Sequence, residues 1–165
     1  MSNIVPAWVR HPVKAIADAI QGGERPTEET EIPARSLEQR RVRILCVDDN
    51  PQVLRLLQRQ LGDLYEVSIA QTAPEALTIL EAGEPVDVIV SDLRMPDVHG
   101  LTFLKQAREL YPSTERIILT GLPDPDFARS TGGSEQLILK PWTKTELIEA
   151  VENAVRRRRE SGTGQ

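Results

Sequence analysis

Short apolar runs alternate along the chain with stretches in which apolar residues recur every three or four positions. The runs cover residues 42–47, 65–70, 86–92, 116–120 and 136–140. Short runs rich in Val and Ile, closed by Gly and Pro, predict strands that are buried on both faces. Five such strands alternating with helices predict an α/β domain with a doubly wound, parallel five-stranded sheet and flanking helices.

The stretches between these runs predict the helices. Asn50 is a good N-cap, Pro51 suits a first helical position and Gly62 is a stop signal, so a helix is expected over 51–61. Further helices are expected over about 74–81, over about 101–110 and after the N-cap Thr143. Between 120 and 140 only about 126–130 can be helical, because two prolines and paired glycines flank it, which predicts a short or irregular fourth helix.

Composition divides the chain into three parts. Residues 1–36 form an N-terminal extension, in which apolar positions over 4–20 predict a short amphipathic helix and 22–36 read as a linker rich in Gly, Glu, Thr and Pro. The globular domain is expected over 37–160, and 161–165 as a disordered tail. For the extension, packing back on the domain, pairing with a second copy, anchoring to a partner or membrane surface, and disorder all stay open.

Charge and composition exclude several classes. The net charge of −5 over 165 residues does not favour nucleic-acid binding by bulk electrostatics. No apolar stretch approaches the roughly 20 residues of a membrane helix, and no signal peptide is apparent. The single cysteine, Cys46, lies inside an apolar run and is expected to be a core residue. These features predict a cytoplasmic protein with no membrane span.

Polar residues follow four of the predicted strands at the point where each strand ends. They are Asp48 with Asp49, Asp92, Thr120 and Lys140. In open parallel sheets the carboxyl ends of the strands share one edge, and that edge binds ligands. Three carboxylates gathered there are a suitable site for Mg²⁺, which prefers oxygen ligands.

The same residues resemble the response-regulator receiver domain of two-component signalling, a CheY-like family. The resemblance covers about 42–157 and rests on five markers in order: Asp48-Asp49-Asn50, Asp92-Leu93-Arg94-Met95-Pro96, Gly100, Thr120-Gly121 and Lys140-Pro141. It implies the strand order 2-1-3-4-5. It also implies that Asp92 is a nucleophile that takes a phosphoryl group from a histidine kinase or a histidine phosphotransfer protein.

The resemblance further implies a role for each remaining marker. Asp49 and Asp92 would bind Mg²⁺ directly, Asp48 largely through water, and Arg94 through its backbone carbonyl. Lys140 would supply a cation and Thr120 a hydroxyl donor to the phosphoryl oxygens, while Gly121 leaves room. Such a domain is no enzyme beyond its own phosphorylation and dephosphorylation, and it needs no catalytic histidine, which leaves His11 and His99 without a role.

Phosphorylation would then change protein–protein contacts. The expected output surfaces are 121–159 or the N-terminal helix, with a downstream partner or a second copy, and no direct DNA binding is expected. Two departures from the family concern this output: Leu137 stands where most receivers carry an aromatic residue, and the 120–140 segment is short. The basic run 156–159 suits a solvated helix end, with contact to nucleic acid or an acidic partner as the alternative.

Two competing functions belong to other classes. The first is a scaffold or adaptor with a receiver fold that no longer uses phosphorylation, which the two departures favour and the intact acidic residues oppose. The second is a haloacid-dehalogenase-like phosphatase, which also uses an aspartyl nucleophile and Mg²⁺. It requires an Asp-x-Asp arrangement after the first strand, and Asp48-Asp49-Asn50 does not provide one.

Overall fold

The computed structural model describes residues 40–95, 100–122 and 135–162. From Arg40 onward the chain forms one compact unit. The expected N-terminal helix, the expected short fourth helix and His99 fall outside the described residues. In the described part of the chain, no helix is both long enough and apolar enough to cross a membrane.

The sheet confirms the expected topology. Its strands are β1 (Arg43–Val47), β2 (Glu66–Ala70), β3 (Val88–Asp92), β4 (Glu115–Thr120) and β5 (Gln136–Leu139), in the order β2-β1-β3-β4-β5. Every pairing is parallel, with Cys46 opposite Val90 and Asp92 opposite Leu119. Parallel pairing brings the carboxyl ends of all strands to one edge of the sheet.

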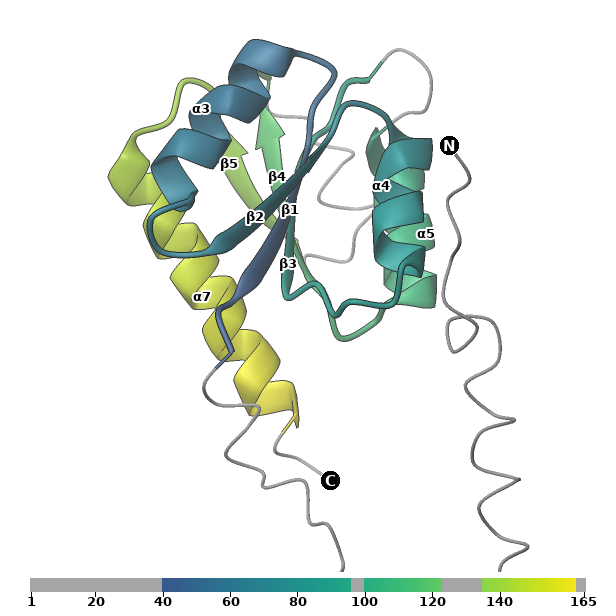
Figure 1. The fold of residues 1–165 in the computed structure, drawn as a ribbon. Helices are drawn as coiled ribbons and strands as arrows, with labels where there is room; N and C mark the ends of the chain where they lie inside the picture. The colour runs from purple at the N-terminus through teal and green to yellow at the C-terminus, as the bar shows by residue number, and fades with distance from the viewer. Residues whose placement is uncertain (1–39, 96–99, 123–134, 163–165) are drawn as a thin grey trace, which may run out of the picture. The chain divides into compact units, whose positions relative to one another are not determined.

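Helices cover both faces of this sheet. They are α3 (Pro51–Leu61), α4 (Ala73–Glu81), α5 (Gly100–Leu110) and α7 (Lys144–Gly162). Figure 1 shows α4 and α5 together on one face, and α3 and α7 on the other. The result is a three-layer α/β fold in which β3 is the central strand, between β1 and β4.

Two hydrophobic cores follow from the alternation of side chains along each strand. In β1, Leu45 and Val47 face α4 and α5, whereas Ile44 and Cys46 face α3 and α7. Leucines 54, 57 and 61 of α3 recur at helical spacing and fill the second core. Cys46 is fully buried, which confirms its assignment to the core.

The helix N-caps explain why the chain turns sharply where the strands end. The Asn50 side chain accepts a hydrogen bond from the Gln52 N–H at 2.9 Å, and Pro51 occupies the first helical position. Thr143 accepts from the Glu146 N–H at 3.2 Å, while the Glu146 carboxylate accepts from the Thr143 N–H at 2.7 Å. This reciprocal pair is a capping box. Both expected N-caps are therefore confirmed.

Three expectations about the helices differ in detail. The helical spacing of the apolar residues in 101–110 predicts that Leu110 is buried, but Leu110 is 61% exposed, because Tyr111 follows the spacing of Ala107 and packs on the core instead. The last helix reaches Gly162, inside the segment assigned to a tail. The apolar spacing also predicts Ile148 and Val155 on the buried face of this helix, but both are only partly buried, and alanines 150 and 154 are buried there. Small residues let α7 approach the sheet closely.

Candidate functional site

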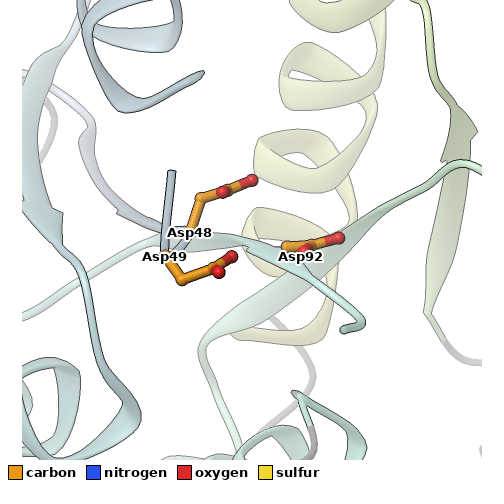
Figure 2. Close-up of side chains that lie close together, drawn as sticks. All are labelled: Asp48, Asp49 and Asp92. Carbon is orange, nitrogen blue, oxygen red and sulfur yellow. The ribbon is translucent and has the colours of Figure 1, made fainter. Parts of the chain in front are cut away.

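Three carboxylates meet at the carboxyl edge of the sheet. Asp48 and Asp49 follow β1 directly, and Asp92 is the last residue of the neighbouring strand β3. One carboxylate oxygen from each lies within 4.8 Å of the other two. Figure 2 shows the three side chains side by side. The sequence-based expectation that strand order would bring these residues together is supported by this geometry.

Lys140 joins this group from the residue that follows β5. Its ammonium nitrogen lies 3.3 Å from Asp48 Oδ2 and 3.2 Å from Asp92 Oδ1. The Lys140 backbone N–H donates to the Thr120 carbonyl at 2.7 Å, which continues the β4–β5 ladder by one residue. The backbone is thereby fixed at the sheet edge while the flexible side chain spans the two acids.

Asp48 is the most deeply placed of the three carboxylates. It is 1% exposed, and burial raises its pKa, since the charged form is poorly solvated. The Asn50 N–H, which donates to Asp48 Oδ1 at 2.8 Å, and the Lys140 ammonium oppose this shift, and the nearby Asp92 charge adds to it. A cation bound at this edge would therefore stabilise the ionised form of Asp48 further.

The backbone of Asp92 and Leu93 packs against Gly100, the first residue of α5. The side chain of Asp92 is 11% exposed. The Gly100 N–H donates to the Leu93 carbonyl at 3.0 Å. A Cβ on Gly100 would lie 2.3 Å from the Asp92 backbone oxygen, so no other residue fits there without a shift of the backbone. The close approach fixes the carbonyl of the Asp92–Leu93 peptide bond.

Thr120 ends β4 at the same edge, but its hydroxyl is engaged locally. It donates to the Leu122 carbonyl at 2.9 Å and accepts from the Leu122 N–H at 3.3 Å. The side chain thus closes a tight turn after the strand. To donate to a ligand at Asp92, the hydroxyl must give up the Leu122 carbonyl, which removes one of the two bonds that close the turn.

One contact beside the site was not expected from the sequence. The Trp142 indole N–H donates to Gln60 Oε1 at 3.0 Å, and the ring packs against the core between α3 and α7. Trp142 stands two residues after Lys140, so this bond fastens the loop that carries the lysine. The spacing of Gln60 and Trp142 in the sequence gives no signal for it.

Comparison with known proteins decides the family. The model of the response regulator receiver domain family matches residues 44–152. The chain belongs to that family. The part of the protein with the five strands and the acidic cluster is thus a receiver domain of two-component response regulators.

Relatives and solved structures agree with this assignment. The receiver is 37% identical over 115 residues to the hydrogenase transcriptional regulatory protein HoxA of Cupriavidus necator, covering 68% of this chain and 24% of that protein. It is 33% identical to the transcriptional regulatory protein AruR of Pseudomonas aeruginosa, covering 70% of this chain and 50% of that protein. The chain therefore matches about a quarter to a half of the length of these relatives.

Among solved structures, a signal receiver domain of an HD domain-containing protein from Pseudomonas fluorescens is similar. It has a TM-score of 0.70 and 33% identity, covering 76% of this chain and 95% of that one. The chemotaxis protein CheY4 of Vibrio cholerae has a TM-score of 0.66 and 28% identity, covering 70% of this chain and 99% of that one. Family membership removes the haloacid-dehalogenase reading, and the fold is that of a CheY-like receiver.

Proposed function

We propose that Asp92 is the phosphoacceptor of this receiver. The observation that supports it is the position of its carboxylate at the end of the central strand β3, 3.2 Å from a lysine ammonium and beside two further aspartates. A carboxylate oxygen of Asp92 attacks the phosphorus of a phosphohistidine. The phosphorus–nitrogen bond breaks, and the imidazole leaves with the electron pair and takes up a proton. An ionised carboxylate needs no general base.

The residues present fit a Mg²⁺ ion. They offer hard oxygen ligands from Asp48, Asp49 and Asp92 within 4.8 Å of one another, and the Arg94 backbone carbonyl is a proposed fourth ligand. Bound there, Mg²⁺ would offset the negative charge of the carboxylates and of an incoming phosphoryl group. Asp48, already oriented by the Asn50 N–H, would act largely through water.

Lys140 and Thr120 are proposed to hold the transferred group. Phosphoryl transfer depends mainly on positioning and charge stabilisation, and the Lys140 ammonium already spans Asp48 and Asp92. Thr120 exchanges its bond to the Leu122 carbonyl for one to a phosphoryl oxygen. Because that bond closes the turn after β4, the exchange moves the chain that follows Thr120 and reports the state of Asp92.

Partners are proposed on the same basis. A histidine kinase or a histidine phosphotransfer protein supplies the phosphoryl group, which places this receiver in the cytoplasm. The output surface is assigned to 121–159 or to the N-terminal segment, where a downstream protein or a second copy binds. Within the first of these, Leu122 and Leu139 are 58% and 50% exposed. A phosphorylation-independent adaptor is disfavoured because the acidic cluster and Lys140 are complete.

The test is phosphorylation of the full chain by acetyl phosphate and Mg²⁺, followed by intact mass measurement. Wild type is expected to gain one phosphoryl group, and Asp92→Asn none. Asp63→Asn, in an exposed turn, serves as the matched control and is expected to behave like wild type. EDTA is expected to prevent the reaction. A folded wild-type protein that gains no adduct, or an adduct that persists in Asp92→Asn, would refute the assignment.

A further inference from the structure

A further buried carboxylate lies at the edge of the sheet opposite the acceptor site. Asp87 immediately precedes β3, and its side chain is only 9% exposed. An ionised carboxylate at that depth is strongly destabilising unless it is paired and hydrogen-bonded. Asp87 interrupts an apolar run in the sequence, and nothing in the acceptor chemistry uses it.

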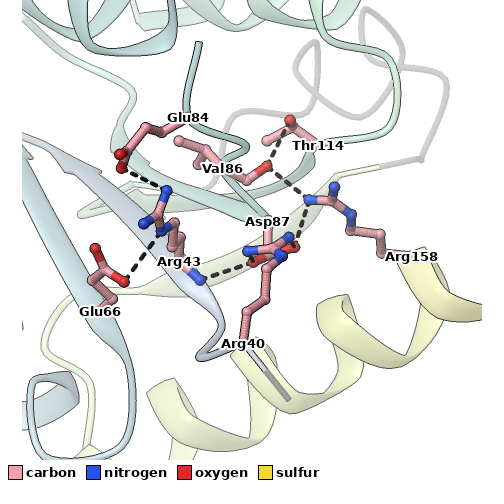
Figure 3. Close-up of polar contacts among 8 residues, drawn as sticks. All are labelled: Arg40, Arg43, Glu66, Glu84, Val86, Asp87, Thr114 and Arg158. Atoms are coloured by element: carbon pink, nitrogen blue, oxygen red, sulfur yellow. Dashed lines mark hydrogen bonds and ion pairs between the residues drawn. The ribbon is translucent and has the colours of Figure 1, made fainter. Parts of the chain in front are cut away.

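Two arginines and one backbone amide converge on this carboxylate (Figure 3). Arg40 donates through both terminal nitrogens, with Nη1 2.9 Å from Oδ2 and Nη2 2.7 Å from Oδ1. Arg158 Nη1 lies 2.7 Å from the same Oδ1. The Arg43 backbone N–H donates to Oδ2 at 2.8 Å. A bidentate guanidinium with two additional donors is among the strongest arrangements for a carboxylate.

The backbone around Asp87 is equally well fixed. The Asp87 N–H donates to the Arg43 carbonyl at 2.9 Å, and the Asp87 carbonyl accepts from the Glu115 N–H at 2.9 Å. The preceding carbonyl, of Val86, accepts from Arg158 Nη1 at 2.7 Å and from Thr114 Oγ1 at 2.9 Å. These backbone hydrogen bonds hold Asp87 in place between β1 and β4. The other partners of its carboxylate are the side chains of Arg40 and Arg158.

The two arginines come from opposite ends of the domain. Arg40 precedes β1 and is the residue through which the preceding chain enters the compact unit, whereas Arg158 lies in the last turns of α7. Arg158 belongs to the basic run 156–159, which the sequence suggested to be a solvated helix end. For Arg158 that interpretation is wrong, since its side chain is 22% exposed and paired with a buried acid.

We propose that Asp87 is a shared anchor that couples the N-terminal flank of the receiver to the end of α7. Because Arg40 and Arg158 bind the same oxygen, Oδ1, a displacement of α7 changes the field and the hydrogen bonding that hold Arg40. The Arg40 guanidinium is thereby sensitive to the position of the last helix. This inference is independent of the proposed phosphorylation, since none of its groups belongs to the acceptor site.

Electrostatics gives the anchor a distinctive signature. Each arginine is attracted to Asp87 and repelled by the other arginine. Removal of one arginine lowers the stability by its attraction to Asp87, but the repulsion between the two arginines is lost as well and offsets part of this cost. Removal of the second arginine then loses its attraction with no such offset. Removal of the carboxylate is the worst change, because two cations are then left facing each other. Two unrelated surface ion pairs would instead be additive.

The first experiment follows the Arg40 guanidinium in the full chain by NMR. Arg158→Gln is expected to shift the Arg40 side-chain ¹⁵N–¹H signals. Arg156→Gln is the matched control, since Arg156 is exposed on the same helix and bonds Asn153 of that helix. Arg40 signals that move equally in both variants, or in neither, would overturn the coupling.

The second experiment is a double-mutant cycle in urea unfolding of the full chain. The folding equilibrium constant of Arg40→Gln/Arg158→Gln is expected to fall by about fivefold or more beyond the product of the two single effects. In an Asp87→Asn background, Arg158→Gln is expected to cost less stability than in wild type, since only its bond to the Val86 carbonyl is then lost and its repulsion with Arg40 is relieved. Additive single effects, or an equal cost of Arg158→Gln in both backgrounds, contradict a shared anchor. Should Asp87→Asn fail to fold, the arginine cycle still decides.

Discussion

The ammonium of Lys140 lies between two carboxylates, 3.3 Å from Asp48 Oδ2 and 3.2 Å from Asp92 Oδ1. The three residues follow or end three different strands of one parallel sheet, so the contact exists only in the folded domain. In this arrangement one side chain balances the repulsion of the acids and also offers a cation beside the acceptor oxygen.

Replacement of Lys140 separates these two roles. Lys140→Met is expected to slow phosphorylation by acetyl phosphate on the order of a hundredfold, as loss of one charged stabilising group at a reacting oxygen typically does. Mg²⁺ affinity is not expected to fall, because the ammonium and the metal ion are attracted to the same carboxylates. Lys144→Met, at the exposed start of α7, is the control. Loss of both Mg²⁺ binding and phosphorylation would instead indicate a disrupted site.

A methyl group at Gly100 tests how closely the start of α5 packs against the backbone of Asp92. The added Cβ would lie 2.3 Å from the Asp92 carbonyl oxygen and 2.8 Å from that of Leu93, and neither is a flexible side-chain atom. Gly100→Ala is therefore expected to lower the free energy of unfolding by about 2 kcal/mol and to slow phosphorylation. A Cβ on Gly121 meets nothing within 4 Å, so Gly121→Ala is expected to preserve stability in the same urea titration. Equal stability of the two variants would contradict the close packing.

Burial makes the only thiol of the chain unreactive. Desolvation raises the pKa of Cys46 from 9.0 to about 12, so the thiolate is nearly absent at neutral pH. Native protein is expected not to react with Ellman's reagent at about pH 8, and protein unfolded in urea is expected to react completely. Fast labelling of the native state would show that the sheet opens around β1.

The capping box of α7 predicts a pH dependence. The Thr143 N–H and hydroxyl hydrogen-bond the Glu146 carboxylate and lower its pKa below 4.5. A carboxyl group whose pKa is lower in the folded state stabilises above its unfolded pKa, and this stability is lost as the pH falls through the folded pKa. Wild type is therefore expected to lose more stability than Glu146→Gln, whose side chain cannot ionise, when the pH is lowered from about 5 to about 3.

The neighbouring Thr145→Ala is the control for that comparison, since Thr145 is exposed and makes no described contact to Glu146. Thermal unfolding across this pH range measures both variants. An identical pH profile for wild type and Glu146→Gln would mean that the capping box does not persist in solution.

The fold and the composition of the acceptor site were predictable because both depend on local patterns. Apolar runs fixed the strands to within one or two residues, and a parallel sheet leaves no choice about which ends meet. Asp48, Asp92 and Lys140 could therefore be placed together before their distances were known. The state of Thr120 could not, because its hydroxyl bonds the next turn of the chain, and that preference depends on the backbone geometry of the loop.

Other features depend on pairings that no local pattern encodes. Arg158 reads as one of four consecutive arginines, and only the packing of α7 selects it for Asp87 while Arg157 pairs with Glu115 at 2.9 Å. The buried face of α7 likewise contains Ala150 and not Ile148, because the helical phase set by the buried Leu147 and Val151 turns position 148 partly away from the sheet. Side-chain hydrophobicity alone ranks these residues in the opposite order.

Strand β3 carries a carboxylate at each end, Asp87 before its first residue and Asp92 as its last. Five residue steps of extended chain separate them by about 16 Å, across a layer of buried Val and Ile that excludes water and ions. The two acids are too far apart to share partners, so each can change without chemical conflict with the other. The acceptor site at one edge of the sheet can therefore stay the same while the residues at the opposite edge are adapted to different neighbouring segments. Strand β3 separates these two parts of the domain.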